Sequence, residues 1–135
     1  MGIAVKESLM GWKNPPTNFG IKVLAGADDL TKKVTAEILQ GVVISTPVDT
    51  GQARGNWRVK VGSVDGSVSL GATDTSGQGA VTKGMAVISQ GKLIGKVTYV
   101  SNSLRYIERL NSGWSMQAPI NFVGLTIQRV TNKYK

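Results

Sequence analysis

The chain has 135 residues, the length of one ordinary domain, and a hydrophobic content of 41% that suits a globular core. It contains no cysteine and no histidine, which excludes thiol catalysis, histidine-based catalytic pairs and Cys/His zinc sites within one chain. Sixteen Lys and Arg against eight Asp and Glu leave a net charge of +8, which favours a polyanion or an acidic protein as partner.

The first 49 residues carry equal numbers of basic and acidic side chains, so the whole positive excess lies in residues 50–135. The remaining acid–base groups are carboxylates, lysines and three tyrosines, a small set for an enzyme. We therefore expect a protein that is not an enzyme and has no cofactor or metal. No stretch approaches the roughly 18 apolar residues that span a membrane, so we expect no membrane partner.

The N-terminal residues are interrupted by glycines and by the pair Pro15-Pro16. Consecutive prolines exclude a helix and favour an extended backbone. We therefore predict an extended arm over residues 1–25, which can dock on a neighbouring subunit, and a single domain over residues 26–135.

The first predicted helix begins at Asp28 or Asp29, because either carboxylate can cap the free N–H groups of a helix start. A metal-binding pair is the weaker interpretation of these two acids. The helix ends before Pro47, since the residue preceding a proline resists helical geometry. One face is apolar and the other polar, with Lys32, Lys33, Thr35, Glu37 and Gln40 on the polar side. The apolar stripe contains Leu30, Val34, Ile38, Leu39, Val42 and Val43.

After Gly51 the apolar residues alternate, as in a strand with one buried face. Trp57 begins the first alternating run, residues 57–61, and a second run covers residues 67–70. Asp65-Gly66 between them is a strong signal for a two-residue hairpin turn. The pattern therefore predicts a hairpin in which Val61 faces Leu70 and Ser63 faces Val68.

The following segments complete the prediction. Residues 71–79 are small and polar and predict a flexible loop in which nothing needs burying, whereas residues 80–90 fit a short helix or an irregular strand. Residues 93–100 predict a strand, residues 103–110 a short helix, and the chain from Pro119 a last helix. The predicted fold is α+β, with a small antiparallel sheet covered by the long helix and the C-terminal helix.

Two further patterns concern catalysis and charge. Ser89 and Lys92 match the SxxK pattern of one hydrolase class, a match that is common by chance. Arg58 and Lys60 point away from Trp57 on the predicted strand, and a basic face of this kind is either solvated or attracts phosphates. Arg105 and Arg109 add basic residues on the predicted short helix.

Two longer segments resemble a known family. Residues 46–57, TPVDTGQARGNW, resemble the TPVDTGxARxNW signature that follows the first helix in a family of small neck proteins of tailed bacteriophages. Residues 106–119, YIERLNSGWSMQAP, look like the family's YIxRLNxGWSxQAP stretch and follow in the expected order. The similarity extends over about residues 27–130 and leaves the proline-rich arm unexplained.

The family contains head–tail joining and tail-completion proteins. The resemblance implies a structural virion protein that acts as tail-completion or tail-terminator protein, in a ring of identical subunits, with six expected. Implied partners are other neck, portal-complex or tail proteins and, transiently and without specificity, the DNA that passes through the channel. The implied location is the virion neck, after assembly in the host cytoplasm. The alternatives are a head-closure neck protein and a basic nucleic-acid-binding module.

The motif residues have simple physical roles in this reading. Pro47 ends the helix, Asp49 and Thr50 bond backbone N–H groups in a turn, Gly51 supplies a permissive φ, and Arg54 can pair with Asp49. Trp57 fills the core. In the second motif, Glu108 and Arg109 can pair across a subunit boundary, Trp114 is a packing anchor, and Pro119 opens the last helix. Arg58, Lys60 and Arg105 join Glu108 and Arg109 as candidate subunit-facing or DNA-facing residues.

Overall fold

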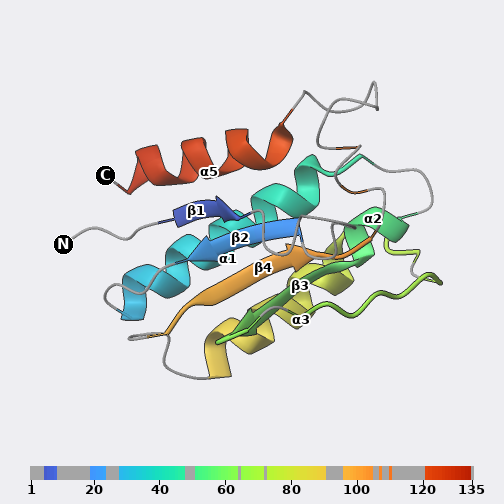
Figure 1. Cartoon of the computed structure of the whole chain (residues 1–135), viewed down its shortest axis with the longest axis horizontal. Coiled ribbons are helices and arrows are strands. Elements are labelled where there is room, and N and C mark those ends of the chain that lie inside the picture. The colour runs from blue at the N-terminus through green and yellow to red at the C-terminus, as the bar shows by residue number, and fades with distance from the viewer. Residues whose placement is uncertain are drawn as a thin grey trace.

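The computed structural model describes residues 5–8, 19–23, 28–47, 51–63, 65–71, 73–90, 96–104, 107, 110 and 121–134. Helices and strands alternate irregularly along these residues, which confirms the predicted α+β class (Figure 1). In chain order the elements are β1 (Val5–Ser8), β2 (Phe19–Val23), α1 (Asp28–Ser45), α2 (Gln52–Gly55), β3 (Trp57–Val61), α3 (Gln78–Gln90), β4 (Thr98–Asn102) and α5 (Phe122–Lys133).

The four described strands form one antiparallel sheet with the order β1-β2-β4-β3. Val100 in the inner strand β4 lies opposite Ile21 of β2 on one side and Val59 of β3 on the other. All three are buried, because this line of residues faces the helices. Strand β4 pairs with β2 on one side and with β3 on the other, and both partners are distant from it in the sequence.

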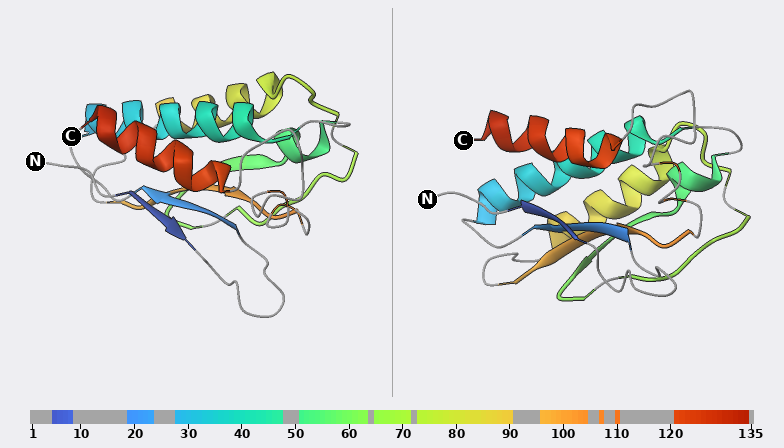
Figure 2. Two further views of the ribbon diagram at one scale, coloured as in Figure 1. Left: turned by 90° about the horizontal axis from the view of Figure 1, so that it is seen from above. Right: turned by 45° about the horizontal axis from the view of Figure 1, so that its top comes forward.

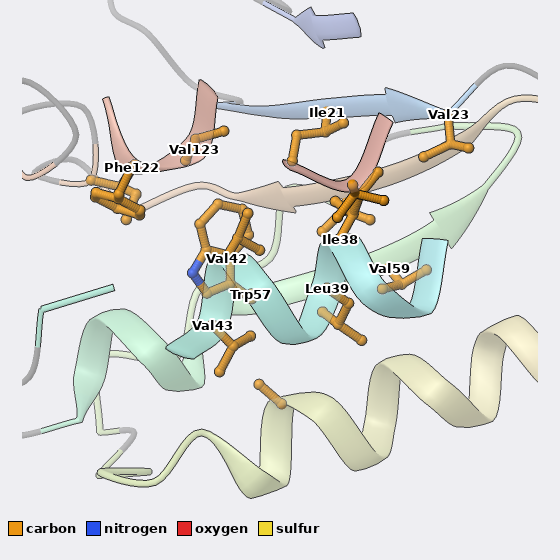
Figure 3. Close-up of a cluster of buried hydrophobic side chains, with 14 of the residues drawn as sticks. Ile21, Val23, Ile38, Leu39, Val42, Val43, Trp57, Val59, Phe122 and Val123 are labelled. Carbon is orange, nitrogen blue, oxygen red and sulfur yellow. The ribbon is translucent and has the colours of Figure 1, made fainter. Parts of the chain in front are cut away.

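Helices α1, α3 and α5 lie on the same face of the sheet, with α1 between the other two (Figure 2). The apolar stripe of α1 is buried as predicted from Val34 to Val43, and Leu30 is half-buried. The buried part of the stripe forms the centre of the core with Trp57 and Phe122 (Figure 3). Thr35, predicted on the polar side, is instead fully buried and donates to Thr31 O at 2.7 Å. Because α1 has neighbours on both flanks, its buried arc is wider than the stripe that faces a sheet alone.

Residues 80–90, which the sequence left open between helix and strand, belong to helix α3. Gly84 lies where α3 packs closely against Leu39 of α1 and Val59 of β3. A Cβ atom there would lie 2.3 Å from Leu39 Cδ2 and 2.9 Å from Val59 Cγ2. Only a glycine lets α3 pack this close to both α1 and β3.

The predicted hairpin between residues 57–61 and 67–70 is wrong. β3 pairs with β4, and residues 65–69 form no strand. Asp65 does not sit in a two-residue hairpin turn: its Oδ1 accepts hydrogen bonds from Ser67 N at 3.0 Å and Ser67 Oγ at 2.6 Å. Such local side-chain bonds compete with strand pairing. Val59 of β3 instead lies opposite the buried Val100 of β4, while Val68 and Leu70 stay exposed.

The predicted boundary between an arm and a domain at residue 25 is also wrong. β2 lies inside the sheet, and Ile21 and Val23 are completely buried, so this part of the arm belongs to the domain. One neighbour of β2 is β1, and the other is β4, which lies about eighty residues further along the chain. No local pattern near residue 20 indicates that partner. Pro15 and Pro16 lie outside the described residues.

The loop predicted over residues 71–79 contains a buried residue, Gly77, contrary to the expectation that nothing in it needs burying. Asp74 Oδ2 accepts from Ala80 N at 2.9 Å and so holds the start of α3. Burial of Gly77 follows from its position against α1 at the entry to α3.

The C-terminal predictions agree in outline with the structure. β4 overlaps the predicted strand, Ile107 and Leu110 are helical, and α5 begins after Asn121, whose Oδ1 accepts from Gly124 N at 3.1 Å. Within the described chain, no helix is both long and apolar enough to cross a membrane.

Candidate functional site

Residues 46–47 and 51–57 lie at a junction between the end of α1, the short helix α2 and the start of β3. Arg54 of α2 is at its centre. Its Nη2 donates to Ile44 O at 2.8 Å, its Nε to Thr46 O at 2.9 Å and its Nη1 to Thr75 O at 2.9 Å. The last carbonyls of a helix lack helical partners and carry partial negative charge. The guanidinium therefore closes the end of α1 and ties it to the chain before α3.

Trp57 connects the same junction to the core. Its side chain is buried, as predicted, and its Nε1 donates to Thr46 Oγ1 at 2.8 Å. Thr46 Oγ1 in turn donates to Val42 O at 2.6 Å. The largest core side chain is thus oriented by a polar contact with the residue that follows α1.

Two asparagines that the sequence analysis missed hold the ends of the strands. Asn56 donates to Gln52 O at 2.7 Å and Ser69 O at 2.9 Å, and accepts from Ser69 N at 2.6 Å. Asn102 donates to Ala53 O at 2.8 Å. Both lie directly beside apolar alternating runs, and this position could have indicated their role. A polar residue that is buried there must form hydrogen bonds with backbone groups.

Gly51 has the conformation that the sequence predicted for it, with φ of 90°. A Cβ atom at this position would lie 2.5 Å from Thr75 N and 2.6 Å from the carbonyl carbon of Asp74. The glycine is therefore required both by its backbone angle and by the close passage of another segment. Pro47 follows the end of α1 and is half-buried.

Several predicted residues fall outside the described ones: Asp49, Thr50, Arg105, Glu108, Arg109, Trp114 and Pro119. The proposed Arg54–Asp49 pair is among these untested contacts. Arg58 is half-buried and donates to Gly55 O at 2.8 Å and Ser67 Oγ at 3.3 Å, whereas Lys60 is exposed. The two predicted basic strand residues therefore differ, one being engaged locally and the other facing solvent.

Neither candidate for chemistry is assembled by the described residues. Ser89 Oγ donates to Ala86 O at 3.2 Å within α3, and Lys92 lies outside them. The part of the chain that the structure describes contains no group of three or more acidic residues that could hold a metal ion. The junction's polar side chains bind backbone groups and so serve to fix the fold.

A groove of about 340 Å³ lies between α1 and α5. Ile44 and Leu125 line it and are 65% and 47% exposed, so the groove presents two large apolar side chains to solvent. Phe122, Glu37 and Arg129 also line it. We call Ile44, Leu125 and the groove between them the groove patch.

A second exposed apolar pair lies in the segment after β3. Val68 and Leu70 are 40% and 75% exposed, although the segment itself is firmly held. Gln52 Nε2 donates to Leu70 O at 2.6 Å. The Asn56 side chain donates to the backbone oxygen of Ser69 and accepts from its backbone nitrogen. We call Val68 and Leu70 the segment patch. It lies beside β3, whereas α5 lies on the other side of α1 (Figure 1).

Glu37 joins α1 to the end of α5. Its carboxylate accepts from Tyr134 OH and from Lys133 Nζ, the latter at 2.9 Å. These hydrogen bonds, the Tyr134 one first, lower the pKa of Glu37 below its usual value of 4.5. The same contact raises the pKa of Tyr134.

Comparison of the chain with protein-family models, with curated proteins and with solved structures finds no match.

Proposed function

We propose that this chain is a non-enzymatic assembly protein of the tailed-phage neck, a tail-completion protein whose subunits close into a ring. The two sequence segments that resemble the neck family motivate the assignment. The single structural observation that supports it is the presence of two separate apolar patches on different sides of one small domain.

The two patches suit a head-to-tail contact. A ring requires a heterologous interface, in which different surfaces of neighbouring subunits meet. The groove patch is concave and lies between two helices, whereas the segment patch presents apolar side chains from a segment outside the helices and strands. In the proposed ring, Val68 and Leu70 of one subunit enter the groove beside Ile44 and Leu125 of the next.

The polar contacts of the segment strengthen this argument. Gln52 and Asn56 hold the backbone at Ser69 and Leu70 while the neighbouring apolar side chains face outward. Holding an apolar segment in one shape reduces the entropy that is lost when a partner binds. The arrangement is that of a prepared contact surface.

The test is the assembly state of purified protein, by mass measurement and negative-stain electron microscopy. We expect annular particles with a central hole, formed alone or on addition of the tail or portal partner. Leu70→Asp and Ile44→Asp should each abolish them. Gln90→Asp, which adds the same charge at an exposed position on α3, is the control and should leave them intact.

Mixing the two variants makes the test specific for a head-to-tail contact. The Leu70→Asp subunit keeps its groove and the Ile44→Asp subunit keeps its segment, so the mixture should stop at a dimer with one intact interface. Particles without a central hole, or unchanged rings from either variant, would contradict the proposal.

A further inference from the structure

The register of the sheet places three lysines and one tyrosine in a single line across the strands. Lys6 of β1 lies opposite Lys22 of β2, Lys22 lies opposite Tyr99 of β4, and Tyr99 lies opposite Lys60 of β3. These residues are scattered over the sequence, and only the strand order β1-β2-β4-β3 brings them together. We call them the lysine line.

By register, the four positions of the lysine line fall on the face of the sheet away from the helices. Directly opposed residues of antiparallel strands share a face, and neighbouring lines alternate between faces. The adjacent line of Ile21, Val100 and Val59 is buried toward α1. Helices α1, α3 and α5 all lie on that buried side (Figure 2). Lys60 is accordingly exposed and Tyr99 is half-buried.

The segment after β3 covers a different part of this face. Ser101 Oγ donates to Asp65 O at 3.3 Å, so the segment reaches the line that contains Ser101 and Arg58. Ser101 is buried, whereas Lys60, one line further, remains exposed. Arg58 and Lys60 also help to lower the pKa of Asp65, after the larger effect of the Ser67 hydrogen bonds.

A line of like charges has a cost in the isolated protein. Opposed residues of the same charge destabilise a sheet, and the register opposes Lys6 to Lys22. A bound polyanion offsets this repulsion, because its negative groups attract both lysines. The net charge of +8 acts in the same direction.

We propose that the lysine line is a binding site for the phosphodiester backbone of a nucleic acid. Ammonium groups bind phosphates as point charges without reading sequence. Strands lie about 4.8 Å apart, so the line forms a track of positive charge across the sheet. An aromatic ring within a basic track is the arrangement on which nucleotide bases stack, and it distinguishes this face from one built for an acidic protein. The inference does not require the proposed ring, because one subunit contains the whole line.

The experiment measures binding of fluorescently labelled 30-nucleotide single-stranded and duplex DNA between 50 and 300 mM salt. Lys22→Gln/Lys60→Gln removes the lysines on both sides of Tyr99. The control Lys33→Gln/Lys83→Gln removes the same charge from exposed positions on α1 and α3. We expect the first variant to bind about tenfold or more weakly at 0.1 M salt and its salt slope to fall by about two. The control should stay within about twofold of the parent.

Tyr99→Leu separates the two forms of nucleic acid. If bases stack on the ring, single-strand affinity should fall about fivefold or more while duplex affinity changes little. If neither the single-strand affinity nor the duplex affinity falls, Tyr99 is not part of the site.

The stability of the variants distinguishes a binding role from a structural one. Because the register opposes Lys22 to Lys6, Lys22→Gln/Lys60→Gln should melt at or above the temperature of the parent. Absence of DNA binding at 50 mM salt, an equal loss in the control, or binding of poly-glutamate in place of DNA would overturn the inference. Annular particles formed by the Lys22→Gln/Lys60→Gln variant would show that the ring and the phosphate site are separate properties.

Discussion

The indole Nε1 of Trp57 donates a 2.8 Å hydrogen bond to Thr46 Oγ1, linking the first residue of β3 to the residue that follows α1. Both residues are buried. A buried donor that loses its acceptor costs more free energy than the bond itself contributes. Trp57 therefore fixes the angle at which the chain leaves α1 as well as filling the core.

Replacement of Thr46 tests this contact. Thr46→Val keeps the shape but removes the oxygen, so we expect a loss of about 1–3 kcal/mol in the free energy of unfolding, measured by urea denaturation. Thr46→Ser retains the hydroxyl and should lose about 1 kcal/mol or less, the contribution of one methyl group. Equal losses in the two variants would mean that packing and not the hydrogen bond matters here.

Arg54 is predicted to stabilise the end of α1 through its fork of donors. Arg54→Ala should lower the free energy of unfolding by about 2 kcal/mol, because three carbonyl contacts are lost together. Arg54→Lys should restore less than half of this, since one ammonium cannot reproduce the planar fork. Hydrogen exchange at the last turn of α1 should accelerate in both variants.

Arg58→Ala is the matched control for Arg54. Arg58 contacts one carbonyl and one hydroxyl from the open face of the sheet. Its loss should cost less than about 1 kcal/mol. A larger effect at Arg58 than at Arg54 would contradict the role assigned to the junction.

Gly84 is predicted to tolerate no side chain. Gly84→Ala places a Cβ atom against Leu39 and Val59, and such overpacking costs about 1–3 kcal/mol despite the better helix propensity of alanine. Gly71→Ala, which introduces its Cβ into open space, should change the unfolding midpoint little. A stabilised Gly84→Ala variant would show that α3 does not pack this tightly in solution.

Glu37 is predicted to make stability depend on pH in the acid range. Its pKa is lowered in the folded chain, so its contribution is present above the unfolded value near 4.5 and is lost as pH falls through the folded value. Glu37→Gln should be less stable than the parent at pH 7, and the difference should shrink below about pH 4.5. Urea denaturation between pH 3 and pH 7 measures it. A difference that stays constant over this range would rule out the ionised carboxylate as its source.

Part of the junction around Arg54 could be predicted from the sequence. Gly51 and Trp57 have the backbone conformation and burial that local chemistry predicts, because glycine after a turn and tryptophan in an alternating run are short-range signals. The carbonyl partners of Arg54 could not be predicted from the sequence, because one of them, Thr75 O, lies twenty-one residues away along the chain. Likewise Asn56 finds Ser69 only after the chain has folded back.

By itself, the sequence determined the elements whose pattern is local: the bounds of α1, the apolar face of β3, the helical period of α5 and the α+β class. Only the tertiary structure decided which strands pair. β3 pairs with β4 and forms no hairpin at Asp65, and Ile21 and Val23 lie in the sheet although the sequence predicted an arm there. Strand pairing depends on which distant segment offers the best buried partner. Helix formation depends mainly on residues three and four positions away. The lysine line follows from the same cause, because residues 6, 22, 60 and 99 become neighbours only through the order of the strands.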